Sequence, residues 1–149
     1  MEVYFKELNI TGWSGKTIIV DIDGTITTDG SSDIDPLVLE KVQAMSISNS
    51  IFLFSNKKLI ERDNEVANKL NATLLKSPFK KPSKKVINEL PENLKNNLVV
   101  IGDKVLTDGF FAKNIGAEFV KVKRLTSKDS NFKTKLIYLI DDFFGYFIN

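Results

Sequence analysis

A short apolar run that ends in two carboxylates constrains the fold of this chain more than any other feature. The run Thr17-Ile18-Ile19-Val20 is bounded by glycines and leads directly into Asp21-Ile22-Asp23. Four apolar or β-branched residues between turn formers predict a buried strand of a parallel sheet. Sheets of this kind bind ligands beyond the carboxyl ends of their strands. Because buried acids need a positive partner, we expect a metal ion beside Asp21 and Asp23.

Strand-like and helix-like segments alternate along the chain. Short apolar runs predict strands over residues 17–20, 51–54, 73–75, 98–101 and 118–122. Apolar residues at helical spacing predict helices over residues 36–45, 57–70, 84–90, 108–115 and 132–147. No repeat or composition break divides the chain, so residues 1–149 are predicted to form one domain. The fold class that follows is α/β, a doubly wound three-layer sandwich around a mainly parallel five-stranded sheet.

The amino-acid composition narrows the chemistry that the chain can perform. There is no histidine and no cysteine among its 149 residues. This excludes histidine bases, thiol nucleophiles, disulfides and the usual ligands of zinc and iron–sulfur clusters. Carboxylates, hydroxyls and lysines remain for catalysis, together with a hard cation such as Mg²⁺ that binds oxygen. A net charge of +2 gives no reason to expect a nucleic acid as partner.

Nothing in the sequence resembles a secretory signal or a membrane-spanning segment. The N-terminal residues do not combine basic residues with an apolar run, so we recognise no secretory signal there. No apolar stretch approaches the roughly 20 residues that a membrane-spanning helix needs. On these grounds we expect a cytoplasmic protein.

Polar residues follow several of the predicted strands and would meet at one edge of the sheet. They are Asp21 and Asp23, Ser55 and Asn56, Asp103, and the lysines Lys80 and Lys81 in a fourth connection. Carboxylates from two strand ends and a backbone carbonyl would hold Mg²⁺ in an oxygen site. A hydroxyl, an amide and a lysine would bind a phosphate group, although spacing does not choose between the two lysines. A carboxylate is then the obvious nucleophile, through an acyl-phosphate.

Four segments resemble, in order, the four motifs of the haloacid dehalogenase superfamily of phosphotransferases. They are Asp21-Ile22-Asp23-Gly24-Thr25, Phe54-Ser55-Asn56, Lys81-Pro82 and Gly102-Asp103-Lys104-Val105-Leu106-Thr107-Asp108. Within the superfamily they are similar to the small class IIIA group, which includes phosphatidylglycerophosphate phosphatases. That group usually has Asn at the position of Gly24. The amino-acid sequence of the first motif is closer to that of small-metabolite phosphatases of the same superfamily, so both substrate classes stay open.

The resemblance implies a role for each motif residue. Asp21 would be the nucleophile, and Asp23 would be the general acid and then the base. Ser55, Asn56 and Lys81 would bind the phosphate. Asp21, the carbonyl of Asp23 and Asp103 would hold Mg²⁺, with Thr25, Gly102 and Asp108 in support. The activity would be that of a phosphomonoester hydrolase.

The superfamily's cap domains have no room in this chain. Only about ten residues separate Thr25 from Asp35, and one helix and one strand fill the segment from Ser55 to Lys81. We therefore expect an open site with a short flap at residues 26–34. Such a site suits a bulky phosphate, for example phosphatidylglycerophosphate. Two alternatives remain: a capless sugar-phosphate or small-metabolite phosphatase that acts as a homo-oligomer, and a non-catalytic binding module.

The last predicted helix carries a wide apolar stripe. Its members are Phe132, Leu136, Ile140, Phe143 and Phe147, and Ile137, Phe144 and Ile148 widen it. We expect this stripe to pack mainly in the core. The alternative is peripheral contact with a membrane or a partner, which the nearby basic residues Lys121, Lys123, Arg124 and Lys128 would favour on an anionic surface.

Overall fold

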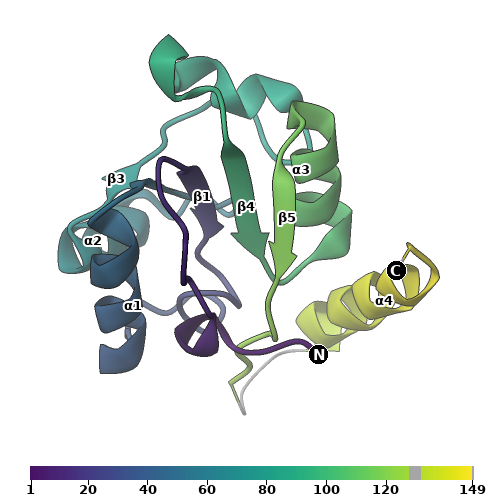
Figure 1. The fold of residues 1–149 in the computed structure, drawn as a ribbon. Helices are drawn as coiled ribbons and strands as arrows, with labels where there is room; N and C mark the ends of the chain where they lie inside the picture. The colour runs from purple at the N-terminus through teal and green to yellow at the C-terminus, as the bar shows by residue number, and fades with distance from the viewer. Residues whose placement is uncertain (128–131, 149) are drawn as a thin grey trace.

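Five parallel strands form a single sheet in the computed structural model, which describes residues 1–127 and 132–148. The strands are β1 (Thr17–Asp21), β2 (Ser50–Phe54), β3 (Thr73–Leu74), β4 (Leu98–Gly102) and β5 (Glu118–Lys121). Their order is β3-β2-β1-β4-β5, and each neighbouring pair is parallel. The predicted α/β fold is confirmed, with a sheet that is parallel throughout (Figure 1).

Helical segments connect the strands. The α-helices are α1 (Pro36–Ser46), α2 (Ile60–Leu70), α3 (Phe110–Ile115) and α4 (Phe132–Ile148). Short 3₁₀ turns are η1 (Phe5–Glu7), η2 (Lys84–Glu89) and η3 (Glu92–Leu94), and a π-helical turn, η4 (Val105–Gly109), precedes α3. Asp35 caps α1 by accepting a hydrogen bond from the Leu37 amide, as the Asp35-Pro36 signal predicts.

Two helices begin differently from the prediction. Helix α2 begins at Ile60 rather than at Lys57, because Lys58 adopts a left-handed backbone conformation with φ 52° that no α-helix accommodates. Asp108 does not open a helix: it lies inside η4, and its carboxylate accepts a hydrogen bond from the Lys104 amide. The segment after Ser83 forms 3₁₀ turns instead of an α-helix.

The alternation of side chains along the strands builds two apolar layers. Ile18 and Val20 of β1 pack with α1 and α2 on one face of the sheet, together with Phe5 near the N-terminus. Ile19 points to the other face, where it packs with η2 and with Phe111 of α3. Helices therefore cover both faces, which leaves the carboxyl ends of the strands as the place where polar groups gather.

Helix α4 does not join either apolar layer, so the expectation that its stripe packs in the core is wrong for the side chains described. Leu136, Ile140 and Phe143 are each 44% or more exposed, whereas the side chains of Phe132 and Phe147 lie outside the described part of the chain. The physical reason is that α1, α2 and α3 already cover the sheet. Among the described residues, no helix is long and apolar enough to cross a membrane.

Candidate active site

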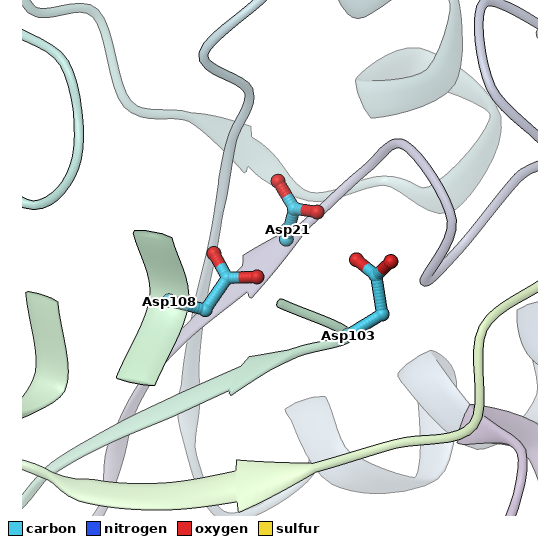
Figure 2. A group of neighbouring side chains, drawn as sticks. All are labelled: Asp21, Asp103 and Asp108. Carbon is cyan, nitrogen blue, oxygen red and sulfur yellow. The ribbon is translucent and has the colours of Figure 1, made fainter. Parts of the chain in front are cut away.

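Three buried carboxylates meet at the carboxyl ends of the two central strands. Asp21 ends β1, Asp103 directly follows β4, and Asp108 lies in η4. One oxygen of each lies within 4.8 Å of the others, and Figure 2 shows the three side chains pointing toward one another. They meet because β1 and β4 pair in register, with Val20 opposite Ile101. We call these three residues the acid cluster.

Lys81 is the cation at one side of the acid cluster. Its Nζ donates to Asp21 Oδ1 at 2.8 Å and to Asp108 Oδ1 at 2.6 Å, and its side chain is 2% exposed. Lys80 is exposed, so the structure decides between the two lysines that spacing left open. Asn56, predicted to bind phosphate, pairs its side-chain amide with the Lys81 backbone: Oδ1 accepts from the amide nitrogen at 2.8 Å, and Nδ2 donates to the carbonyl at 2.9 Å.

Burial and mutual repulsion raise the pKa values of the three carboxylates in the acid cluster. Burial, with the charge of Asp108, raises the pKa of Asp21 to about 6, and burial, with the charge of Asp21, raises the pKa of Asp103 to about 6. Burial also raises the pKa of Asp108. For Lys81 burial alone would lower the pKa, but Asp108 and Asp21 outweigh it and raise it. A set of buried oxygen donors that repel one another fits a hard divalent cation such as Mg²⁺.

Two glycines let the acids come this close. Gly24 has φ +79°, and a Cβ at that position would lie 2.6 Å from Asp103 Oδ2. A Cβ on Gly102 would overlap the carboxylate of Asp108. Thr25, predicted to support the site, donates from Oγ1 to Asp103 Oδ1 at 3.3 Å. The backbone around the acid cluster is therefore shaped by the need to admit three carboxylates.

The carboxylate of Asp23 lies outside the acid cluster and is held by a cation that the sequence analysis missed. Arg62 of α2 binds it with two nitrogens, each at 2.7 Å, and the Gly30 amide and Ser55 Oγ donate to it at 2.7 and 2.8 Å. Burial alone would raise the pKa of Asp23, but these hydrogen bonds outweigh burial and lower it. A signal existed: Arg62 stands in the first turn of the helix that follows the Ser55-Asn56 motif.

Five of the predicted site residues line one small cavity together with three others, whereas Asp103, Asp108, Thr25 and Gly102 do not line it. It is lined by Asp21, Asp23, Ser55, Asn56, Lys57, Lys81, Lys104 and Thr107. Its volume is about 40 Å³, which leaves room for a group about as large as a phosphoryl but not for a whole substrate. Two further lysines, Lys57 and Lys104, stand at this cavity, and the sequence analysis assigned neither of them a role. The cavity thus combines carboxylates with cations that suit an anionic group.

A comparison with known protein families assigns this chain to one of them. The family described as mitochondrial PGP phosphatase matches residues 5–125, which is most of the chain and includes all four motifs. The chain belongs to the mitochondrial PGP phosphatase family. The resemblance to phosphatases of the haloacid dehalogenase type, and to those of phosphatidylglycerophosphate among them, is confirmed. No curated protein and no solved structure matches the chain.

Membership in the PGP phosphatase family indicates a hydrolase of the phosphatase class and corrects the expected location. The family's description is mitochondrial, so the expectation of a cytoplasmic protein is wrong, and the comparison points to mitochondria. That expectation rested on the absence of a recognisable secretory signal. Such an absence carries no information about which compartment a protein reaches.

Arg124 is a second cation at the acid cluster, and it links the cluster to the C-terminal helix, which lies beyond the matched residues. Arg124 Nε donates to Asp103 Oδ2 at 2.9 Å, and its guanidinium also lies 3.7 Å from the carboxylate of Asp141 in α4. Asp141 in turn accepts hydrogen bonds from the amides of Val105 and Leu106 in η4. The sequence signal for Arg124 was its position just after the fifth strand.

Proposed function

We propose that this protein is a Mg²⁺-dependent phosphomonoester hydrolase that acts on phosphatidylglycerophosphate through an aspartyl-phosphate on Asp21. The observation that carries the proposal is the acid cluster of Asp21, Asp103 and Asp108 with Lys81 bound to two of its members. Buried carboxylates around a cavity of phosphoryl size suit a phosphate bound together with a divalent cation. Family membership supports the lipid substrate.

Asp21 is the nucleophile in this proposal. Its carboxylate lines the cavity, and Lys81 fixes one of its oxygens. An Asp21 oxygen attacks phosphorus, the bond from phosphorus to the ester oxygen breaks, and the phosphoryl group passes to the carboxylate. Water then attacks phosphorus, which releases inorganic phosphate and restores Asp21. Lys81 would neutralise negative charge on the phosphoryl oxygens as the bonds change.

Asp23 is the proton carrier of the two half-reactions. It would give a proton to the departing alcohol and take one from the attacking water. In the structure Arg62, Ser55 and the Gly30 amide hold Asp23 in its ionised form. This arrangement suits the second half, in which Asp23 accepts a proton. For the first half Asp23 has to carry a proton, so its contact with Arg62 has to loosen.

Asp21 and Asp103 would hold the Mg²⁺ ion, with Asp108 close enough to bind it directly or through water. All three offer oxygen ligands and no nitrogen or sulfur, which matches the preference of Mg²⁺. The ion would neutralise part of the charge on the phosphate and on the attacking carboxylate. Arg124 and Thr25 position Asp103 for this role through their hydrogen bonds to its two oxygens.

A lipid phosphate fits the shape of the site. The cavity takes little more than a phosphoryl group, and the connections after β1 and β2 contain no cap domain within the described residues. Substrate bulk beyond the phosphate, such as a glycerol and its acyl chains, would therefore stay outside the cavity. Small metabolites that depend on a closed, water-free chamber are disfavoured by the same geometry.

A panel of phosphomonoesters tests the proposal. Phosphatidylglycerophosphate in mixed micelles, p-nitrophenyl phosphate and several sugar phosphates are compared with Mg²⁺ and with excess EDTA, and Asp21→Asn is the matched control. We expect the highest kcat/KM for the lipid phosphate, with loss of turnover in EDTA and in the variant. Beryllium fluoride, a phosphate mimic, should bind the native protein and fail on Asp21→Asn. Turnover by Asp21→Asn would refute the proposed mechanism. A clear preference for a sugar phosphate would refute the proposed substrate.

A further inference from the structure

Among the described side chains of helix α4, a carboxylate is the one most deeply buried against the rest of the protein. Asp141 is 1% exposed, and its carboxylate accepts hydrogen bonds from the amides of Val105 at 2.9 Å and Leu106 at 2.8 Å. One turn further along, Gly145 is buried with its backbone against the side chain of Val105. Asp141 and Gly145 are the buried residues of α4 among those whose side chains the structure describes.

The opposite side of α4 is apolar and exposed. Helical periodicity places four residues on the face away from Asp141, which we call the outer stripe. They are Leu136, Leu139, Phe143 and Tyr146, with exposed fractions of 44%, 66%, 59% and 83%. A helix on a water-soluble surface normally turns its apolar side inward and its charges outward. In α4 the carboxylate of Asp141 is buried and these four apolar side chains are exposed, which points to an apolar environment at the outer stripe.

Helix α4 lies beside a segment that borders the active-site cavity. Figure 1 shows α4 next to the carboxyl ends of β4 and β5, away from the body of the sheet. Asp141 binds the first residues of η4, which directly follows Lys104 and contains Thr107, two residues that line the cavity. Helix α4 is therefore anchored, through Asp141, to a segment that lines the active-site cavity.

The loops around the mouth of this cavity are basic. The four loops that follow β2, β3, β4 and β5 hold the lysines Lys57, Lys58, Lys76, Lys80, Lys81, Lys104 and Lys123 and also Arg124. Among the residues that the structure describes, the acids of these loops are Asp103 and Asp108, and both are buried in the acid cluster. The loop after β1 is acidic, but its Asp29 pairs with Lys57 at 2.7 Å. An apolar stripe beside lysine-bearing loops is complementary to a bilayer of anionic lipids.

We propose that the outer stripe of α4 and these lysine-bearing loops dock on an anionic lipid surface, with the active-site mouth facing the bilayer. Helix α4 lies along the surface and does not cross it, in keeping with its length and its buried Asp141. The inference rests on the proposed function, because a lipid phosphate is the substrate that such a mouth would meet. It draws nothing from the family match, which ends at residue 125, before α4 begins.

Sedimentation with lipid vesicles tests the docking surface. The full chain is mixed with vesicles of phosphatidylcholine alone, or of phosphatidylcholine and phosphatidylglycerol at about three to one, at low and high salt. We expect binding to the anionic vesicles that weakens with salt. The double variant Leu139→Ser/Phe143→Ser should reduce the bound fraction about tenfold or more, because it removes two apolar side chains from the stripe.

Matched controls lie at the opposite edge of the sheet. Ile47→Ser removes an apolar side chain that is 84% exposed just before β2, and it should leave vesicle binding unchanged. Lys76→Gln/Lys80→Gln should weaken binding at low salt, whereas Lys16→Gln/Lys113→Gln, on the side where the strands begin, should not. Melting temperatures and hydrolysis of p-nitrophenyl phosphate are measured on each variant to show that the fold and the site are intact.

The outcomes separate the inference from the proposed function. A protein that hydrolyses soluble phosphomonoesters but ignores anionic vesicles at low salt refutes the docking surface and leaves the function standing. Vesicle binding by a protein that hydrolyses no phosphomonoester would refute the proposed function and leave the docking surface standing. Self-association that Leu139→Ser/Phe143→Ser abolishes, measured by analytical ultracentrifugation without lipid, would assign the outer stripe to a second copy of this chain and overturn the inference. Equal loss of binding in Ile47→Ser would also overturn it.

Discussion

Replacing Asp21 by asparagine should stabilise the metal-free protein near neutral pH, although it removes the proposed nucleophile. The folded protein raises the pKa of Asp21 from about 4 in an unfolded chain to about 6. Between these values the folded state binds more protons than the unfolded state, so the free energy of unfolding falls as pH rises. Above about pH 6 the whole penalty of the buried charge is present. Asparagine has a similar shape and cannot ionise, so it avoids that penalty.

The size of the effect follows from the shift in pKa. About two pKa units correspond to roughly 3 kcal/mol, since one unit is worth about 1.4 kcal/mol. Asparagine does not reproduce the bond that Lys81 makes to the Asp21 carboxyl, so we expect a gain of about 1–3 kcal/mol. For a domain of this length that corresponds to a rise in melting temperature of about 3–10 °C.

Thermal unfolding in excess EDTA measures the effect, with Asp23→Asn as the matched comparison. Asp23 stands two residues further along, but Arg62, Ser55 and the Gly30 amide lower its pKa. Its ionised form therefore stabilises the fold at neutral pH, and this contribution is lost as pH falls through the lowered pKa. At about pH 7.5 we expect Asp21→Asn to melt above the native protein and Asp23→Asn to melt below it.

A dependence on pH distinguishes this electrostatic reasoning from a general packing effect. At about pH 4, close to the unfolded pKa, most of the advantage of Asp21→Asn should disappear. The reasoning is refuted if Asp21→Asn melts at or below the native temperature in EDTA near neutral pH. It is refuted equally if the difference between the two proteins is the same at both pH values.

Three further predictions concern the metal, the backbone and the proton carrier. Mg²⁺ should raise the melting temperature more at about pH 7.5 than at about pH 5, because below about pH 6 the ion has to displace protons from Asp21 and Asp103. An equal rise in melting temperature at both pH values would contradict this prediction. Gly102→Ala should lower the free energy of unfolding by about 1–3 kcal/mol and reduce kcat, since the new Cβ overlaps Asp108 and displaces it from Lys81. Unchanged stability and kcat would show that Asp108 has room to move. Arg62→Gln should raise the pKa of Asp23 and shift the high-pH limb of the kcat profile upward, whereas an unshifted profile would remove Asp23 from the proton transfers.

The sequence alone determined the fold class and which residues could gather at the site. The apolar runs of β1, β2 and β4 are local patterns, and each ends in the polar residue that its motif supplies. Because parallel strands end at the same edge of a sheet, the strand pattern was enough to place Asp21 and Asp103 together. The absence of histidine and cysteine likewise indicated an oxygen-ligated cation from composition alone.

Only the tertiary structure decided which cation pairs with which carboxylate. Lys80 and Lys81 are neighbours in the same loop, and the choice between them depends on Asn56, which is 25 residues away and binds the Lys81 backbone. Arg62 reaches Asp23 across 39 residues, and Arg124 reaches Asp103 across 21. Local patterns do not encode such pairs, because they depend on how helices are placed over the ends of the strands.

The orientation of α4 shows the same limit. The apolar spacing of Leu136, Ile140 and Phe143 is identical whether a helix faces a core, a membrane or a partner, so the sequence predicted the helix, but the expectation that its stripe packs mainly in the core was wrong. In the folded protein α1, α2 and α3 already cover both faces of the sheet. Helix α4 is held instead by the carboxylate of Asp141, which satisfies two backbone amides of η4. Apolar periodicity specifies which side of a helix avoids water, but the surface that covers that side is set by what the rest of the chain has left unfilled.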